Sequence, residues 1–415
     1  MSRHPVASDR ADVVVVGAGI VGLGAAYAAA RRGLRVIVVD RTASPVGATV
    51  RNFGHICIGA QTGLAREFAD ASRDIWLRLA TDAGFWLRES GTLVAARDTT
   101  ELAVLERAAR DGDIELLTAE ELRSHAPVRV GVAGGARLRT DLQTNPREAA
   151  GAIVRHLVAL GVEFRFRTAV TAVSSIRVET TRGAIDCGRV VVAVNHDVDQ
   201  LLPEIAERVG VVRCALDMMR VSAMTPRPLA APLLTAWSLL RYGRFAAFPE
   251  TVALRERLYA ERPELAGLDL NQMYTQLPDG SLILGDSHVR GIQPGPFQPE
   301  PAFDAFIAEA AALLELDDVR VIERWQGVYA SGPEEFLIEQ PEPGLHVIAA
   351  TTGIGMTTGL GLAERMIADS ATTESATTDP RPQPHTSEHR SSQQKEHHER
   401  HRTRRPRHGR DDRPR

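Results

Sequence analysis

Residues 13–40 read VVVVGAGIVGLGAAYAAARRGLRVIVVD, and this stretch decides the fold. The four consecutive valines at 13–16 predict a short parallel strand that is buried on both faces. Gly17, Gly19 and Gly22 follow with the spacing G-x-G-x-x-G, which allows a sharp turn, close approach of a pyrophosphate to the backbone and tight helix packing. The N-terminus of the next helix directs free N–H groups at such a phosphate. The stretch therefore predicts dinucleotide binding.

An acidic residue ends the second predicted strand, 35–39. Asp40 lies 23 positions past Gly17, near the spacing expected of a carboxylate that binds ribose hydroxyls. A glycine-rich turn without a ligand would leave Asp40 unexplained. The carboxylate also argues against NADP, because it would repel a 2′-phosphate, although Arg41 beside it softens that argument.

A second glycine-rich stretch, HVIAATTGIGMTTGLGLAERM, occupies residues 346–366. It also predicts a buried strand, a glycine turn and a helix. We expect Gly353, Gly355, Met356 and Thr357 to place N–H groups where a reduced flavin accumulates negative charge. The alternative is a glycine-rich helix entry that only packs on the first strand. Two such motifs at opposite ends predict that both ends of the folded chain hold one FAD.

Composition limits the remaining possibilities. The 415 residues suffice for two domains, and a net charge of −4 indicates no nucleic-acid partner. Three dispersed cysteines, Cys57, Cys187 and Cys214, predict neither a disulfide framework nor a metal cluster, and they favour the cytoplasm. Residues 371–415 contain no Val, Ile, Leu, Met, Phe, Tyr, Trp or Cys, so we expect a disordered His/Arg-rich tail.

Two alternative readings concern membranes and the tail. Arg3, Arg10 and the following apolar run imitate a signal peptide, but cleavage after the alanines near residue 30 would destroy the nucleotide turn. The run is also too glycine-rich and too short to favour a membrane span. The tail is a solvated segment by default, with weak contact to anionic surfaces or metal binding by its histidines as the alternative.

The rest of the chain predicts an α/β fold with two domains. A discontinuous Rossmann-like FAD-binding domain takes residues 10–95, 135–200 and 335–370. An α+β substrate or cap domain on an antiparallel sheet takes 96–134 and 201–334. The pattern predicts helices at 64–88, 99–110, 251–262, 302–315 and from Pro146, and strands at 91–96, 162–167, 168–174, 189–195, 211–221, 238–245, 272–277 and 281–284.

The chain resembles the FAD-dependent oxidoreductases of the D-amino-acid oxidase and glycine oxidase superfamily over about residues 11–369. The resemblance rests on GAGIVG with Asp40, GATVRNFG at 47–54, TNPREAAGAIVRHLVALGVEF at 144–164, RVVVAVN at 189–195 and TTGIGMTTGLGLAE at 351–364. The segments RNFGHI, SLLRYGRFA and ILGDSH resemble a branch associated with phosphonate breakdown. That finer resemblance implies oxidation of an N-methylated 2-aminoethylphosphonate.

Two positions depart from the superfamily pattern. Asn195 stands where glycine is commoner, although asparagine tolerates left-handed geometry. Val289 and Arg290 follow GDSH where the resemblance implies an acidic and an aromatic residue. These departures concern substrate identity more than flavin binding.

The resemblance and the residue chemistry together suggest where substrate binds. Arg51 and Asn52 follow the ribose strand on a loop that the resemblance places along the flavin, and Arg51 could hold a phosphonate or carboxylate through paired hydrogen bonds. In the cap domain, Tyr242 could pack over the flavin, and His288 could bind an oxyanion or accept the amine proton. Arg241 and Tyr242 would point to opposite faces if 238–245 is a strand.

Each candidate also has a structural interpretation: a surface or cofactor-phosphate ion pair for Arg51, a structural role for His55, and packing or exposure for Arg241, Tyr242 and His288. Covalent flavin attachment at Cys57 has no support from its neighbours.

The predicted activity is oxidation of the C–N bond of a small anionic amine by hydride transfer to flavin N5, with oxygen as electron acceptor. The amine is an N-methylated aminophosphonate or an amino acid. The alternatives are a 2-hydroxy-acid dehydrogenase that passes electrons to a carrier, and a flavin-binding protein without turnover.

Overall fold

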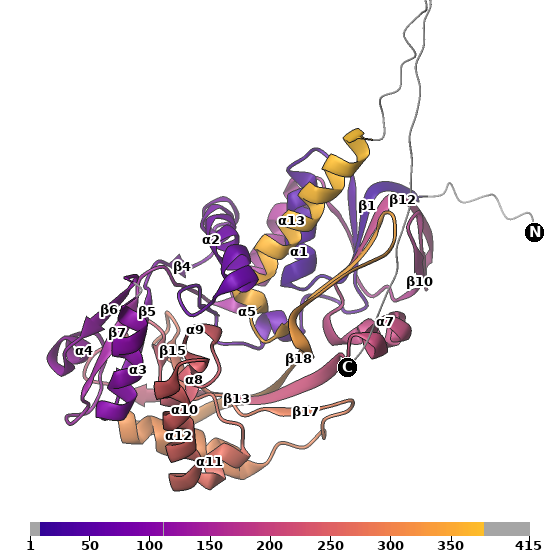
Figure 1. Cartoon of the computed structure of the whole chain (residues 1–415). Helices are drawn as coiled ribbons and strands as arrows, with labels where there is room; N and C mark the ends of the chain where they lie inside the picture. The colour runs from indigo at the N-terminus through magenta and orange to yellow at the C-terminus, as the bar shows by residue number, and fades with distance from the viewer. Residues whose placement is uncertain (1–8, 111, 377–415) are drawn as a thin grey trace, which may run out of the picture. The chain divides into compact units, whose positions relative to one another are not determined.

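The computed structural model describes residues 9–110 and 112–376 (Figure 1). Its last helix, α13 (Gly355–Ala376), continues past residue 370, where the sequence predicts the tail to begin. The rest of that predicted tail lies outside the described residues. Within the described ranges, no helix combines the length and the apolar composition that crossing a membrane requires.

Five neighbouring strands form the parallel part of a large mixed sheet. In spatial order they are β19 (Leu345–Thr352), β12 (Gly183–Val192), β1 (Asp9–Val16), β2 (Val36–Val39) and β9 (Glu163–Arg165). Each pairs in parallel with its neighbour. The valines of β1 are buried on both faces, as their β-branched run predicts.

Helices cover one face of this parallel part, and a smaller layer covers the other. The first layer contains α1 (Ile20–Ala30), α2 (Gly63–Ala83), α5 (Pro146–Ala159) and α13. The second contains β10 (Val170–Ser174), β11 (Arg177–Thr180), η2 (Asn195–Asp197), α6 (Val198–Leu201) and α7 (Pro203–Arg208). Alternate residues of β1 supply the two cores, with Val13 and Val15 on one side and Val14 and Val16 on the other.

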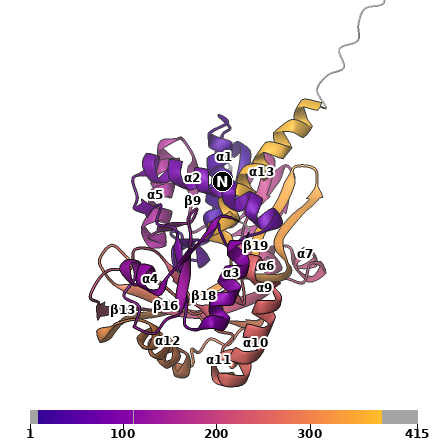
Figure 2. The ribbon, with the colours of Figure 1, turned by 60° about the vertical axis from the view of Figure 1, so that its left-hand side comes forward.

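The predicted antiparallel sheet is present. It contains β13 (Val212–Met224), β14 (Leu233–Leu234), β15 (Met273–Gln276), β16 (Leu282–Gly285) and β17 (Val289–Gly291). It continues through β5 (Thr92–Ala96), which pairs in parallel with β14, and then through β7 (Gly134–Leu138) and β6 (Ile114–Leu117). Its helices are α3 (Thr99–Ala109), α4 (Ala119–His125), α10 (Pro249–Glu261), α11 (Pro263–Gly267) and α12 (Glu300–Leu313). Helices α10–α12 lie at the end opposite α1 (Figures 1 and 2).

One strand joins the two parts into a single sheet. β18 (Asp317–Glu342) pairs antiparallel with β13 over its first half and with β19 over its second half. The sequence did not predict this strand. Because β5 pairs with β7 and β14, we propose that the first domain boundary falls before Thr92 rather than at residue 95. The two-domain division itself stays a proposal.

The structure corrects two predicted elements. The helix predicted at 64–88 ends at Ala83, because Gly84 takes a left-handed conformation with φ 70° and caps it, so Trp86 lies beyond the helix. The strand predicted at 238–245 is wrong. Residues there form two short helices, α8 (Ala236–Leu239) and α9 (Gly243–Ala246), with a turn between them.

Short elements shape the loop that follows β2. It contains the 3-10 helix η1 (Ala48–Val50) and β3 (His55–Ile56), which pairs with β8 (Leu142–Thr144) and through it with β4 (Leu87–Arg88). This three-stranded sheet supports residues 51–57, most of which line a large cavity.

Candidate active site

The first glycine turn has no room for a side chain at Gly17 or Gly22. Gly17 has φ 104°, and a Cβ atom there would lie 2.5 Å from the carbonyl oxygen of Ala193. A Cβ atom on Gly22 would lie 1.9 Å from the carbonyl oxygen of Gly17. The turn therefore keeps α1 close to β1. The N–H of Ile20, the first residue of the helix, donates to Oγ1 of Thr49 at 2.8 Å.

Asp40 holds this turn from the end of β2. Its Oδ2 accepts a hydrogen bond from the backbone N–H of Ala18 at 2.7 Å, and its Oδ1 accepts bonds from the N–H and hydroxyl of Thr42. The neighbouring Arg41 side chain is 60% exposed and pairs with Asp197 at 2.6 Å. The carboxylate thus lies beside the glycine turn, whereas Arg41 does not line the cavity.

The second glycine turn lies next to the first. A Cβ atom on Gly359 would come within 3.0 Å of Val21, and one on Gly24 within 3.1 Å of Ala363, so α13 packs closely on α1. Gly353, with φ 80°, lies against Tyr329, whose Cζ would be 3.1 Å from an added Cβ.

Two hydrogen bonds fix the start of α13. The indole N–H of Trp76 donates to the carbonyl of Met356 at 2.9 Å. The backbone N–H of Cys57 donates to Oγ1 of Thr357 at 3.0 Å.

A cavity of about 680 Å³ extends from these turns into the antiparallel part. Its wall contains ten of the predicted site residues: Gly19, Arg51, Asn52, Arg241, Tyr242, His288, Gly353, Gly355, Met356 and Thr357. Gly17, Gly22, Asp40 and Arg41 are not in the wall; the first three shape the turn from behind it. The volume is typical of a cavity for a small molecule or cofactor.

The side chains of the loop residues Arg51 and Asn52 differ in how many of their polar atoms are already hydrogen-bonded within the protein. The amide of Asn52 donates to the carbonyls of Ala48 and Thr49, and its Oδ1 accepts from the N–H of Gly54, so its polar atoms hold the loop itself. Arg51 is exposed, and its Nη1 donates to the carbonyl of Gln326 at 3.2 Å. Arg51 is therefore the one of the two that can reach a ligand.

Arg241 and Tyr242 both line the cavity, because the backbone turns between α8 and α9 instead of running as a strand. Nη1 of Arg241 donates to Oδ1 of Asp269 at 2.7 Å, and Nη1 of Arg290 donates to the other carboxylate oxygen. Burial raises the pKa of Tyr242 well above its usual value, so its phenol stays protonated.

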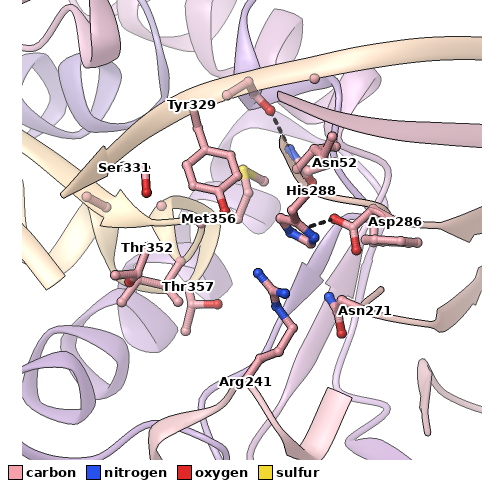
Figure 3. A pocket seen from close by; sticks show the side chains of 18 of the residues that line it. Asn52, Arg241, Asn271, Asp286, His288, Tyr329, Ser331, Thr352, Met356 and Thr357 are labelled. Atoms are coloured by element: carbon pink, nitrogen blue, oxygen red, sulfur yellow. Dashed lines mark hydrogen bonds and ion pairs between the residues drawn. The ribbon is translucent and has the colours of Figure 1, made fainter. Parts of the chain in front are cut away.

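Two titratable groups of the GDSH segment face each other in the wall (Figure 3). Oδ2 of Asp286 lies 3.6 Å from Nε2 of His288, whose Nδ1 lies 3.0 Å from the carbonyl oxygen of Asp269. Burial raises the pKa of Asp286 to about 7, against the attraction of Arg241. Burial and Arg241 lower the pKa of His288 to about 3, so its imidazole is neutral at physiological pH.

His55 and Cys57 line the same wall, and Asp141 lies behind them, with the potential ligand atoms of the three residues within 4.8 Å of one another. Nε2 of His55 already contacts Oγ1 of Thr92, and burial raises the pKa of the Cys57 thiol, which therefore stays protonated. His55 thus has the structural contacts of a buried histidine.

Several cavity residues were missed by sequence reasoning: Asp269, Asn271, Asp286, Arg290 and Tyr329. Asp286 lies within the segment ILGDSH that sequence reasoning did single out, and Arg290 follows it, so a charged residue on each side of His288 was an available signal. Asn271 and Tyr329 carry no local motif, and only the pairing of distant strands brings them to the cavity.

The sequence profile "DAO: FAD dependent oxidoreductase" matches residues 12–369. The chain belongs to this family. Its cofactor is therefore FAD, and the protein is an FAD-dependent oxidoreductase. A search of curated proteins found no match.

Several solved structures share the fold. Glycine oxidase from Bacillus cereus superposes with a TM-score of 0.70 at 18% identity, covering 88% of this chain and 95% of that chain. L-proline dehydrogenase from P. horikoshii gives a TM-score of 0.69 at 19% identity and coverages of 89% and 95%. Iminodiacetate oxidase from Chelativorans sp. gives a TM-score of 0.67 at 18% identity, covering 87% of this chain and 95% of that chain.

The residues present fit FAD. The closed turn at Gly17–Gly22 leaves room for backbone approach, and the cavity runs continuously from Gly19 past the second turn to the polar wall. The bound isoalloxazine supplies the redox chemistry by accepting a hydride equivalent, so the chain has to position the substrate and manage its proton.

Proposed function

We propose that the protein oxidises the C–N bond of a small anionic amine, with hydride transfer to FAD. The observation that supports this most is the composition of the cavity wall opposite the glycine turns. Arg241 and Arg290 supply positive charge there, and the buried Asp286 supplies a carboxylate close to Arg241. A molecule that carries an acid group at one end and an amine at the other matches both charges.

FAD would be held between the two glycine turns. Gly17, Gly19 and Gly22 would admit the pyrophosphate to the N-terminus of α1, and Asp40 would bind the adjoining ribose. Because Asp40 already accepts bonds from Ala18 and Thr42, it has only its remaining lone pairs for the ribose.

The start of α13 would hold the other end of FAD. Gly353, Gly355, Met356 and Thr357 place the N-terminus of that helix in the cavity wall. The positive end of this helix's dipole would favour the flavin edge that becomes negative on reduction. Asn52 supports the neighbouring loop rather than binding through its own amide.

Arg241 would bind the acid group of the substrate. Nη1 is used by Asp269, and the other N–H groups of the guanidinium remain for a carboxylate or phosphonate. Arg51 lines the same cavity from the loop side and is the second candidate for that group. Tyr242 would pack beside the ligand, with His288 as a neutral hydrogen-bonding group.

The substrate class includes amino acids and N-methylated aminophosphonates. Glycine oxidase and iminodiacetate oxidase, named for small amino acids, support the first choice through a shared fold only. The segments RNFGHI, SLLRYGRFA and ILGDSH support the second through the resemblance stated above. Oxygen as the electron acceptor and a cytoplasmic location complete the proposal.

The test is anaerobic reduction of the purified yellow protein by a panel of amines. The panel contains N-methyl-2-aminoethylphosphonate, sarcosine, glycine and D-amino acids, with 2-hydroxy acids as the competing substrate class. We expect the flavin to bleach with at least one anionic amine, and peroxide to form when air is admitted. Bleaching by 2-hydroxy acids alone, or by no member of the panel, would refute the proposal.

A further inference from the structure

Two buried oxygen atoms in the cavity wall have no hydrogen-bond partner among the described residues. They are Oδ1 of Asp286 and Oδ1 of Asn271. Both residues line the cavity and are more than nine-tenths buried, with Asp286 5% and Asn271 8% exposed. A buried acceptor without a donor is costly, so these atoms indicate a ligand that donates hydrogen bonds.

The backbone places the two acceptors side by side. The N–H of Asn271 donates to the carbonyl of Asp286, and the N–H of Asp286 donates to the carbonyl of Asn271, both at 2.8 Å. This reciprocal pair fixes the two side chains on the same wall of the cavity (Figure 3). Tyr329 and Met356, next to the second glycine turn, lie across the cavity from them.

Resting on the proposed function, we propose that Asp286 is a catalytic residue that binds the substrate ammonium and takes its proton before the C–H bond breaks. An ammonium group donates two or three hydrogen bonds, and a carboxylate with a neighbouring amide oxygen accepts them. Arg241, on the adjacent wall, binds the acid end of the same molecule. The arrangement therefore selects amines over neutral isosteres.

The proton step balances without a further reagent. An N–H bond of the ammonium breaks, its electron pair stays on nitrogen, and the proton forms an O–H bond with Asp286. The neutral amine then loses a hydride from the adjacent carbon to FAD, and the nitrogen lone pair forms the C=N bond. Water hydrolyses the product iminium to an amine and a carbonyl compound.

The environment of Asp286 suits this exchange. The charged and titratable groups that interact with it are Arg241, Asp269, His288, Cys214, Tyr242 and Tyr329. Only Arg241 is a cation among them when His288 is neutral, and Arg241 shares its charge with Asp269. A carboxyl group with a pKa of about 7 both ionises and reprotonates near neutral pH, as a proton acceptor must.

The experiment compares each amine with its ether analogue, in which oxygen replaces the N–H group. Sarcosine is paired with methoxyacetate, and N-methyl-2-aminoethylphosphonate with 2-methoxyethylphosphonate. Binding is followed through the flavin absorbance under anaerobic conditions, and the rate of bleaching is measured at saturating amine. The acid group is the same within a pair. The ratio of the two dissociation constants therefore measures how much the N–H group contributes to binding.

We expect Asp286→Asn to weaken amine binding by about tenfold or more, while ether binding stays unchanged. We also expect it to slow bleaching by about a hundredfold at neutral pH, since a positioned base contributes at least that factor. The deficit should shrink as the pH rises, because solution then supplies neutral amine. The matched control is Asp217→Asn, a neighbouring buried carboxylate that bonds Ser287 and Gln326 outside the cavity.

The wild-type protein gives a second readout that needs no variant. Its preference for amine over ether should fall about tenfold between pH 8 and pH 6, as a group with a pKa near 7 protonates. A preference that is flat with pH, or an Asp286→Asn variant that binds and oxidises amines like Asp217→Asn, would overturn the inference. If no amine bleaches the wild-type flavin, the proposed function fails instead.

Discussion

Arg241 and Asp269 form the ion pair that orders the substrate side of the cavity, with Nη1 of Arg241 2.7 Å from Oδ1 of Asp269. The other oxygen of that carboxylate accepts from Arg290. One carboxylate therefore aligns two arginines in the wall, and these three side chains together carry a net positive charge. This residual charge is the basis for proposing an anionic substrate.

Replacing Arg241 by glutamine should weaken binding of an anionic amine by about 10- to 100-fold, because charge-assisted hydrogen bonds contribute about 1.5–3 kcal/mol. Dissociation constants from flavin absorbance titrations measure the effect. Arg257→Gln is the control, since Arg257 pairs with Asp98 and does not line the cavity. Equal affinities in the two variants would show that Arg241 does not bind the acid group.

Gly22→Ala should abolish FAD retention. Its methyl group would lie 1.9 Å from the carbonyl oxygen of Gly17, so the turn and the start of α1 must move apart. Gly151→Ala is the matched control, because an added Cβ there meets only the end of Arg155 at 3.5 Å. In that helical position alanine should stabilise the protein by up to about 1 kcal/mol. The measurement is flavin content per chain after gel filtration, and a fully loaded Gly22→Ala protein would contradict the account.

Asp286 should make stability depend on pH in a defined window. Its pKa is raised from an ordinary value of about 3.9 to about 7, so the folded protein binds more protons than the unfolded chain between these values. Its contribution is therefore full below about pH 4 and is lost as the pH rises to 7. Compared with Asp286→Asn, the wild type should become progressively less stable across that window.

Thermal unfolding of both proteins at matched pH values measures the difference. His288, whose pKa is lowered, has the opposite dependence, but it is present in both proteins and its effect largely cancels. A difference that does not change between pH 4 and 7 would show that Asp286 is not a buried carboxyl with a raised pKa.

Asn195 should tolerate glycine better than alanine. It has φ 58°, and its Oδ1 accepts a hydrogen bond from the N–H of Ala330, which ties the end of β12 to β18. Alanine loses the bond and is strained in this conformation, at a cost of about 2–3 kcal/mol in the free energy of unfolding. Glycine loses the hydrogen bond to Ala330 but adopts the positive φ without strain. Denaturant unfolding of the two variants compares them, and a glycine variant no more stable than the alanine variant would contradict this reading.

The fold was predictable wherever the pattern was local. The valine run of β1, the glycine spacing and Asp40 gave the nucleotide-binding unit, and Pro146 marked the first turn of α5. The long strand β18 was not predictable, because its residues alternate irregularly and are stabilised by pairing with β13 and β19, which are distant in sequence.

In the site, too, features with a local sequence motif were predictable and features that depend on distant contacts were not. The glycine turns and the cavity positions of Arg51, Arg241, Tyr242 and His288 followed from sequence motifs. The predicted strand at 238–245 failed because the short segment SLLRYGRF has no hydrophobic period that separates a strand from two short helices. This error wrongly separated Arg241 from Tyr242. Asp286 and Asn271 needed the structure, since their role depends on which polar atoms remain without partners.

The most direct test of the central claim is anaerobic mixing of the purified yellow protein with anionic amines, followed through the flavin absorbance. We predict stoichiometric FAD that is bleached by at least one small amine carrying a carboxylate or phosphonate, at a rate that saturates with its concentration. Flavin that stays oxidised with every such amine, or protein that remains colourless after incubation with FAD, would contradict the claim.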